Sequence, residues 1–482
     1  MEDNLKSKAV SGVVWSAISR FSTQGLAFIF NLLIARQLMP EDYGVIAMLN
    51  IFLAISNTFI DSGFGNALMR KKDRTEADIN TVFYFNVVIS ILCYFALFIA
   101  SPAIARFYDM PLLEKVTKVI GVTLILNATG TMQSTILTIR IDFKTKTKIS
   151  IIGSICTGIV GVVLVYAGYG VWALVLQQLF SCFIGCALNW FYVRWWPQLI
   201  FSWKSFKELF SYGSKILAAG MLNSVYGNLS DIIVGKVYSA SDLGEYSKSG
   251  SLAGFPAKNL TGVLMSVTFP VLVSIQDQPE RLEKYYKKII NLSVFAVFPI
   301  MIGIAAVADP LIRVLLTDKW AGIVYLLQIT CFDAMWSPVH SINLSLMQVM
   351  GKSDYFLKLE IVKKILGLII LAATVPMGIV AMCYGKVIGS LIGLFINTYY
   401  TKKLIGYGIW DQLKGMTHIL IHALVMGVIA FLTVKLFDNN IIRLVAGTLA
   451  GMIYYFSAAY IFKFPELDEM LLLVKEQFHK SN

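Results

Sequence analysis

Long apolar stretches, separated by short polar breaks, recur along nearly the whole chain. Each stretch is about 20 residues long, the length that a helix needs to cross roughly 30 Å of hydrocarbon. The pattern therefore predicts an all-α polytopic membrane protein with about fourteen transmembrane helices. The predicted spans cover residues 12–34, 44–68, 79–104, 116–138, 149–167, 171–193, 209–235, 244–275, 289–308, 321–349, 357–375, 378–400, 413–435 and 441–462.

The polar breaks are too short to form a separate catalytic domain. Any chemistry must therefore take place among the helices or at their rims, which argues against an enzyme. The composition agrees, because 57% of the 482 residues are hydrophobic and only 15% are charged. Such a chain has too little polar side chain to cover a water-soluble globule.

Lysine and arginine gather in every second break, as expected for loops on the cytoplasmic side of a membrane. The alternation predicts that both termini are cytoplasmic. The net charge of +12 then requires no nucleic acid as a partner, because basic inner loops lie against anionic lipid headgroups. The cation-rich breaks include Lys6, Lys8, Arg70, Lys72, Arg140, Lys144, Arg194, Lys204, Arg281, Lys284, Lys358, Lys364, Lys402 and Lys414.

The chain contains a repeat. Asn31 to Leu49 reads NLLIARQLMPEDYGVIAML, and Asp231 to Ser249 reads DIIVGKVYSASDLGEYSKS, with the same apolar run, a cation and an Asp-x-Gly in register. The similarity continues further on, where Lys144 pairs with Lys352. One repeat holds six predicted spans, and an even number makes both copies enter the membrane from the same side. The two halves should therefore be parallel repeats, related by an axis along the membrane normal.

The repeat predicts an N-lobe at residues 1–200, a C-lobe at residues 201–404, and two extra helices with a cytoplasmic tail at residues 405–482. Two similar bundles form a central cleft between them. Rocking one lobe against the other would open that cleft to each side of the membrane in turn.

Charged residues inside the predicted spans are candidates for the lining of this cleft, because a charge at membrane depth is costly unless it faces a cavity or a partner. Arg20 lies among serines and threonines, although it is close enough to the cytoplasmic end to extend toward headgroups. Lys258 lies mid-span beside Pro256, where we expect a proline break to free main-chain carbonyls. The other substrate-cleft candidates are Asp61, Lys215 and Asp231.

Asp333 and His340 lie seven residues apart, on one face of the predicted span 321–349. A carboxylate and an imidazole at this depth could carry a proton or bind a cation, and the alternative is an ordinary hydrogen-bonded buried histidine. The six cysteines all fall inside spans without the neighbours that a metal site needs, so we expect neither a metal nor a cofactor.

Two sequence runs and the arrangement of the predicted spans resemble those of a known family. The RQLMPEDYG run at residues 36–44, the WKSFKELFSYG run at residues 203–213, the duplicated halves and the two extra spans are similar to the polysaccharide transporter family. These are lipid-linked oligosaccharide flippases of the multidrug/oligosaccharidyl-lipid/polysaccharide exporter superfamily.

The resemblance implies a substrate, namely an oligosaccharide repeat unit on a polyprenyl diphosphate. It would be moved from the inner to the outer leaflet of a bacterial plasma membrane to build lipopolysaccharide, exopolysaccharide or capsule. The further partners would be membrane lipids, a proton or sodium ion, and the polysaccharide assembly machinery.

Three alternatives stay open. A drug or metabolite exporter of the multidrug and toxic compound extrusion (MATE) type would share the duplication, but it would have less use for cations in the cleft. A membrane-embedded polymerase or ligase would need a large outer loop with catalytic residues. A scaffold without transport would leave the buried charges unexplained.

Overall fold

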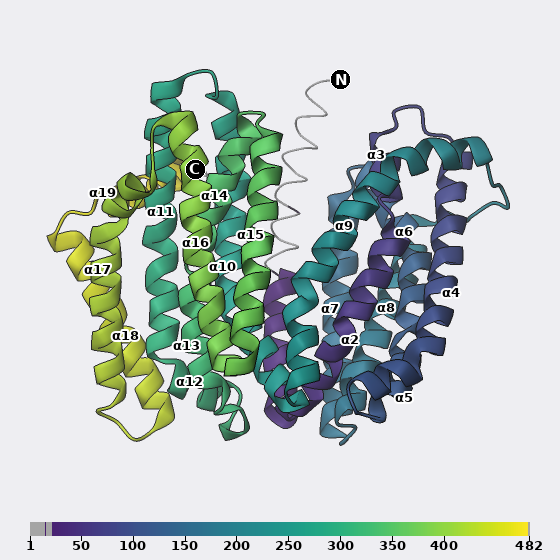
Figure 1. The fold of residues 1–482 in the computed structure, drawn as a ribbon, viewed down its shortest axis with the longest axis horizontal. Helices are drawn as coiled ribbons and strands as arrows, with labels where there is room; N and C mark the ends of the chain where they lie inside the picture. The colour runs from purple at the N-terminus through teal and green to yellow at the C-terminus, as the bar shows by residue number, and fades with distance from the viewer. Residues whose placement is uncertain (1–14, 16–21, 481–482) are drawn as a thin grey trace. The chain divides into compact units, whose positions relative to one another are not determined.

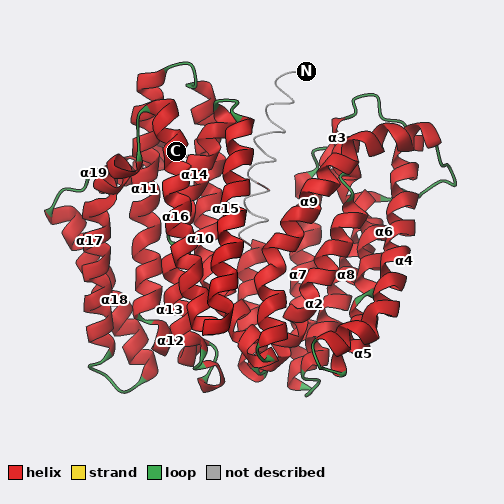
Figure 2. Ribbon diagram, in the orientation of Figure 1, coloured by secondary structure: helices red, strands yellow, loops and turns green. Residues whose placement is uncertain are grey.

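The computed structural model describes Trp15 and residues 22–480, and this part of the chain is helical without any β-strand (Figure 2). Residues 22–37 are helical. The helices that follow are α2 (Pro40–Asp61), α3 (Phe64–Arg70), α4 (Glu76–Phe107), α5 (Leu112–Ile120), α6 (Val122–Ile139), α7 (Phe143–Tyr166), α8 (Val171–Val193), α9 (Trp203–Val237), α10 (Ala240–Ser274), α11 (Pro279–Ala306), α12 (Ala308–Leu315), η1 (Asp318–Trp320), α13 (Ile323–Ala334), α14 (Ser337–Val349), α15 (Ser353–Thr374), η2 (Val375–Met377), α16 (Ile379–Ile405), α17 (Ile409–Val434), α18 (Asn440–Ile461) and α19 (Pro465–Lys480).

Within the described residues, 10 helices are long and apolar enough to cross a membrane, so the chain is a multi-pass membrane protein. They coincide with predicted spans. Of the remaining predictions, the span 12–34 lies largely outside the described residues. The other three correspond to α9, to α13 with α14, and to α15, which are less apolar or are interrupted.

Ser202 caps the start of α9, and the helix then continues without a break to Val237. Two local predictions were wrong. Helix α10 runs through Pro256, so the expected proline break is absent there. A proline removes only one main-chain hydrogen bond, and packed neighbours can hold the helix together around it.

The span 321–349, in contrast, is broken where we expected one helix. Helix α13 ends at Ala334 and α14 begins at Ser337, so Asp333 and His340 lie on different helices. Pro338 lies in the first turn of α14. The N–H groups of a first turn have no acceptor within the helix, so proline, which lacks this group, is tolerated there.

The described chain forms two compact units, residues 1–244 and 245–482. In the first unit α4 packs on α6, α6 on α8, and α7 on α8; in the second α11 packs on α13, α13 and α14 on α16, and α15 on α16. The same order of packing in both units agrees with the duplicated architecture. In the second unit α17 and α18 lie side by side as the two additional helices (Figure 1). The lobe boundaries at residues 200 and 404 stay predictions.

The repeated Asp-x-Gly motif lies against its own copy. A Cβ atom added to Gly44 would collide with the carbonyl oxygen of Ala240, and one added to Gly244 would collide with that of Pro40. Residue 40 pairs with 240, and residue 44 with 244, in the sequence repeat. The contact is therefore reciprocal, and it requires glycine at both positions because main chain meets main chain.

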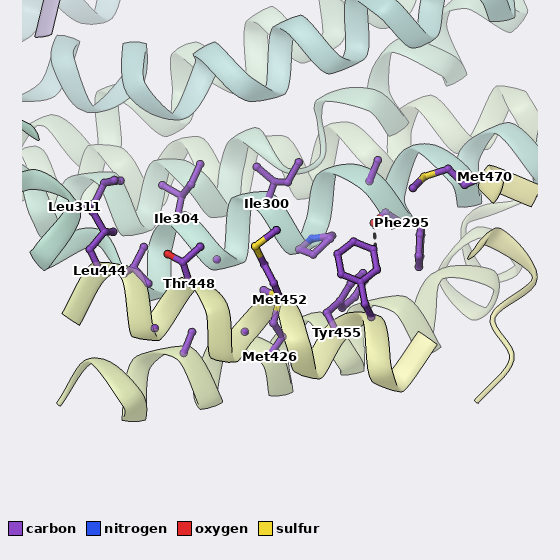
Figure 3. Close-up of a pocket in the computed structure, with 18 residues that line it drawn as sticks. Phe295, Ile300, Ile304, Leu311, Met426, Leu444, Thr448, Met452, Tyr455 and Met470 are labelled. Atoms are coloured by element: carbon purple, nitrogen blue, oxygen red, sulfur yellow. Dashed lines mark hydrogen bonds between the residues drawn. The ribbon is translucent and has the colours of Figure 1, made fainter. Parts of the chain in front are cut away.

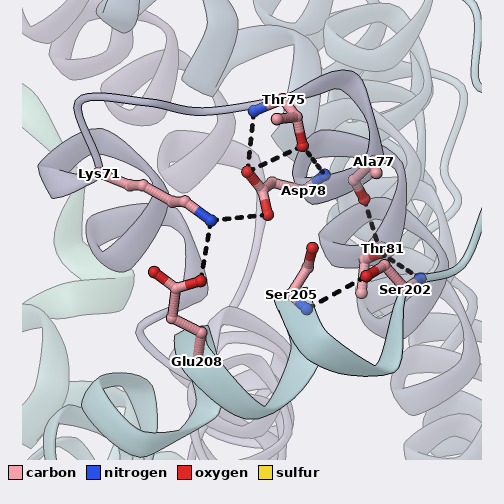
Figure 4. Close-up of polar contacts among 8 residues, drawn as sticks. All are labelled: Lys71, Thr75, Ala77, Asp78, Thr81, Ser202, Ser205 and Glu208. Atoms are coloured by element: carbon pink, nitrogen blue, oxygen red, sulfur yellow. Dashed lines mark hydrogen bonds and ion pairs between the residues drawn. The ribbon is translucent and has the colours of Figure 1, made fainter.

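Polar contacts join the start of α4 to α9 and to the segment that precedes α9. The buried Asp78 carboxylate accepts hydrogen bonds from Lys71 Nζ (3.0 Å) and from the Thr75 main-chain N–H (2.8 Å) (Figure 4). Lys71 also bridges to Glu208 of α9 at 3.0 Å, and this hydrogen bond raises the pKa of Lys71. Nearby, the Ser202 N–H donates to Thr81 Oγ1 (3.0 Å).

Buried polar groups join α17 to the rest of the second unit. The Asn343 side chain of α14 and the Gln412 side chain of α17 exchange hydrogen bonds of 3.1 and 3.2 Å. Thr401 of α16 donates to Asn343 Oδ1 at 2.7 Å. Each partner satisfies groups that would otherwise be buried without a hydrogen bond.

Candidate functional site

A polar pocket of about 500 Å³ lies between α2, α6 and α9 in the first unit. Asp61, one of the predicted site residues, lines this pocket from the last position of α2. Asn57 lies four residues earlier, so both side chains project from the same face of α2. The lining consists of Asn57, Thr58, Ile60, Asp61, Gly63, Asn127, Thr131, Ile216, Leu217 and Gly220.

The pocket forms because α2 ends inside the predicted span. Ser62 and Gly63 adopt the left-handed conformation, with φ of 42° and 68°, and α3 starts directly afterwards. Helix α9 approaches this break closely, since a Cβ atom on Gly213 would lie 2.6 Å from the Ser62 carbonyl oxygen. Irregular backbone at membrane depth is tolerated where it is buried in protein or lines a wet cavity.

A second polar pocket, of about 480 Å³, lies between residues 22–37, α7 and α8. Its polar residues are neutral amides and hydroxyls. The Thr157 hydroxyl is buried and has no hydrogen-bond partner among the described residues. The polar lining comprises Thr23, Asn31, Ser150, Ser154, Thr157, Gln177, Ser181 and Asn189.

The second unit carries an apolar groove of about 510 Å³ between α11, α17 and α18 (Figure 3). Phe295, Ile300 and Ile304 form one wall, and Met426 and Met452 lie opposite them. Met470 of α19 contributes to the lining beside Phe295. The groove suits a hydrocarbon chain and offers almost no hydrogen-bonding group.

The predicted pair Asp333 and His340 meets at Ser390 of α16, although the two residues lie on different helices. His340 Nε2 is 3.0 Å from Ser390 Oγ, and its Nδ1 is 3.0 Å from Asn397 Nδ2. The Ser390 hydroxyl also hydrogen-bonds the Asp333 carboxylate. The positive charge of Lys386 interacts electrostatically with the same carboxylate. Sequence reasoning missed Ser390 and Asn397, which come from another helix.

The other predicted site residues are not part of the lining of the two polar pockets. Arg20 lies outside the described residues. Lys215 on α9 and Lys258 on α10 are exposed, and Asp231 on α9 is half-buried. Burial and the Asp231 charge raise the pKa of Tyr108 to about 12. Among the described residues, no three His, Cys, Asp or Glu side chains gather to hold a metal ion.

Sequence reasoning also missed Asn57, Asn127 and Thr131, which share the pocket with Asp61. A signal existed for Asn57, because it lies one helical turn before Asp61. The sequence held no comparable signal for Asn127 and Thr131, which come from α6.

Comparisons with known proteins identify the family of this chain. Residues 33–325, more than half of the chain, match the family described as polysaccharide biosynthesis protein. The chain is 21% identical over 459 residues to the teichuronic acid biosynthesis protein TuaB of Bacillus subtilis (strain 168), covering 94% of this chain and 95% of TuaB. It is 22% identical over 473 residues to the succinoglycan biosynthesis transport protein ExoT of Rhizobium meliloti (strain 1021), covering 94% and 93%. It is 23% identical over 405 residues to the lipopolysaccharide biosynthesis protein WzxC of Escherichia coli (strain K12), covering 82% and 80%.

Two solved structures share the fold. The lipid II flippase MurJ, in an inward closed conformation, superposes with a TM-score of 0.75 at 15% identity, covering 93% of this chain and 98% of MurJ. An inward-facing multidrug resistance MATE transporter superposes with a TM-score of 0.61 at 13% identity, covering 82% and 98%. The chain therefore belongs to the polysaccharide biosynthesis protein family, with a fold that it shares with MurJ and the MATE transporters.

Proposed function

We propose that this protein is a flippase that moves polyprenyl-diphosphate-linked oligosaccharide repeat units from the inner to the outer leaflet of a bacterial plasma membrane. It would supply surface polysaccharide synthesis by alternating access and would not act as an enzyme. The observation that carries the proposal is a polar pocket with an intramembrane carboxylate, in a multi-pass chain of the polysaccharide biosynthesis protein family. Sugars need such polar surface, since each polar group left unsatisfied in hydrocarbon costs several kcal/mol.

The substrate has three chemically different parts, and different residues suit each. Arg20, Lys215 and Lys258 carry the charge that would attract the diphosphate. Asp61 and Asp231 would line the path of the glycan. The apolar groove between α11, α17 and α18 offers a surface for part of the isoprenoid chain.

The cluster at Ser390 suits ion coupling. Asp333 and His340 could each exchange a proton, and they share one hydroxyl partner on α16. Protonation of either would change the hydrogen bonds that hold α13 and α14 to α16. We propose proton or sodium coupling at this cluster, and contact of the protein with the polysaccharide assembly machinery.

A MATE-type exporter of drugs or metabolites is the second candidate, favoured by the superposition on a MATE transporter. The two functions differ in what accumulates when the protein is missing. A polysaccharide polymerase or ligase is less well supported, because the breaks between helices are short throughout the described chain.

Deletion of the gene should abolish surface polysaccharide and leave lipid-linked oligosaccharide in the inner leaflet. Extracted lipids, analysed by mass spectrometry, and leaflet labelling with a membrane-impermeant lectin would measure both effects. Restoration by a plasmid copy is the control. Drug hypersensitivity with normal surface polysaccharide would instead support the exporter.

Both termini and the cation-rich loops should be cytoplasmic. Single cysteines at positions 72 and 284, in a variant without the six native cysteines, should react with an impermeant maleimide only after the cells are opened. A cysteine at position 168, in a cation-free break, should react in intact cells. The reverse labelling pattern would contradict the proposed orientation.

A further inference from the structure

The Asp61 pocket contains hydrogen-bonding groups that nothing in the described protein uses. The Asp61 carboxylate makes no hydrogen bond or ion pair with any described residue, and neither does the Asn57 side chain. Both are exposed, in a pocket walled by three helices that are predicted to lie in the membrane. Groups of this kind at membrane depth need water or a ligand as a partner.

The charge of the pocket excludes the diphosphate as that ligand. Its lining, all within the described residues, holds one carboxylate and no lysine, arginine or histidine. A diphosphate placed there would meet a like charge at short range in surroundings of low dielectric constant, which is unfavourable. The cations that suit the diphosphate must therefore act elsewhere along the path.

The size of the pocket favours a molecule over a single ion. Its volume of about 500 Å³ lies within the range of ordinary small-molecule sites, roughly 300–1,000 Å³. A dehydrated cation would require several oxygen atoms closing around one point. The open pocket instead has room for a sugar ring together with water.

The chemistry of the lining matches sugar hydroxyls. An ionised carboxylate accepts hydrogen bonds through two oxygens, so Asp61 can receive neighbouring hydroxyl groups of one ring. The Asn57 amide both donates and accepts, as a hydroxyl partner must. The end of α2 adds main-chain carbonyls, of which only some find a partner inside the helix cap, such as Thr58 O with the Ser62 N–H.

We propose that the Asp61 pocket is a glycan-binding subsite that holds hydroxyl groups of the transported oligosaccharide, with Asp61 and Asn57 as its principal contacts. The inference rests on the proposed flippase function and specifies which part of the substrate the first unit recognises. The pocket separates recognition of the sugar from attraction of the diphosphate.

Binding to the purified full-length protein tests this directly. The probe is the lipid-free repeat oligosaccharide, released by mild acid from the surface polysaccharide of the host strain, with inorganic pyrophosphate as a second probe. Asp61→Ala should weaken oligosaccharide binding at least tenfold, because a charge-assisted acceptor is lost. Asp61→Asn keeps one acceptor and should weaken it about threefold, and Asn57→Ala about fivefold. Pyrophosphate should not compete at this site.

Matched controls separate the pocket from general effects. Asp73→Asn removes a carboxylate charge from an exposed loop, and Asn228→Ala removes an amide that is bonded to its own helix, to the Ser224 carbonyl oxygen (2.8 Å). Both controls should bind the oligosaccharide as the wild type does. Equal melting temperatures of all variants would show that the pocket variants fold.

Two results would overturn the glycan subsite. One is wild-type oligosaccharide binding by folded Asp61→Ala and Asn57→Ala proteins. The other is a strict requirement of binding for Na⁺ that disappears in Asp61→Ala, since the carboxylate would then serve a cation. Failure of the flippase proposal is a different result, namely normal surface polysaccharide in the deletion strain.

Discussion

Export of surface polysaccharide should fall at least tenfold when Arg20 and Lys258 are both replaced by alanine. Arg20 lies in the predicted span 12–34, ahead of the first Asp-x-Gly motif, and Lys258 lies in the predicted span 244–275, behind the second. A cation that is only partly hydrated gains far more from a nearby diphosphate than it would in bulk water. Surface polysaccharide, quantified at matched amounts of protein in the membrane, measures the effect.

Conservative changes then separate charge from geometry. Arg20→Lys keeps the charge but loses the planar fork that binds phosphate through two parallel hydrogen bonds. Partial export by this variant would indicate attraction of a point charge, and no export would indicate bidentate binding. Lys72→Ala, in a loop that is predicted to be cytoplasmic, is the matched control and should export normally. Wild-type export by the double alanine variant would eliminate the cationic path.

The second large effect is expected at the reciprocal glycine contact. Leucine at Gly44 or at Gly244 should lower the melting temperature and abolish export, because its Cβ would collide with a main-chain oxygen of the opposite motif. The main chain cannot relieve this collision by a change of rotamer, as a flexible side chain could. Overpacking of this kind costs about 1–3 kcal/mol or more, a large part of the stability of a folded domain.

The contact can be tested with a graded series. Gly44→Ala and Gly244→Ala should already reduce stability, and the double variant should be no more than slightly worse than either one, because both changes open the same contact. Gly250→Ala is the control, since a Cβ atom there meets nothing within 4 Å and alanine suits a helix better than glycine. Identical melting temperatures for Gly44→Ala and Gly250→Ala would contradict the reciprocal contact.

The places where the sequence misled have a common cause. The uninterrupted α10 at Pro256 and the interrupted span at Met335 both depend on what packs around the main chain, and hydropathy does not report that. A proline inside a helix is tolerated or decisive according to whether its neighbours satisfy the freed carbonyl groups. The local pattern alone could not distinguish the two cases.

The sequence by itself determined the membrane class, most of the apolar helices, the duplication and the family, because each is a property of residues that are close in the chain or repeated along it. It also pointed to Asp61, since a carboxylate inside an apolar stretch is conspicuous.

The tertiary structure decided which groups accompany Asp61. Asn57, Asn127 and Thr131 come together only because α2 ends at Asp61 and α6 and α9 close around that end. Ser390 joins Asp333 to His340 in the same way, across 50 residues of chain from His340. Such groupings depend on how helices pack, and packing is set by shape and volume over the whole unit, which no local pattern of polarity records.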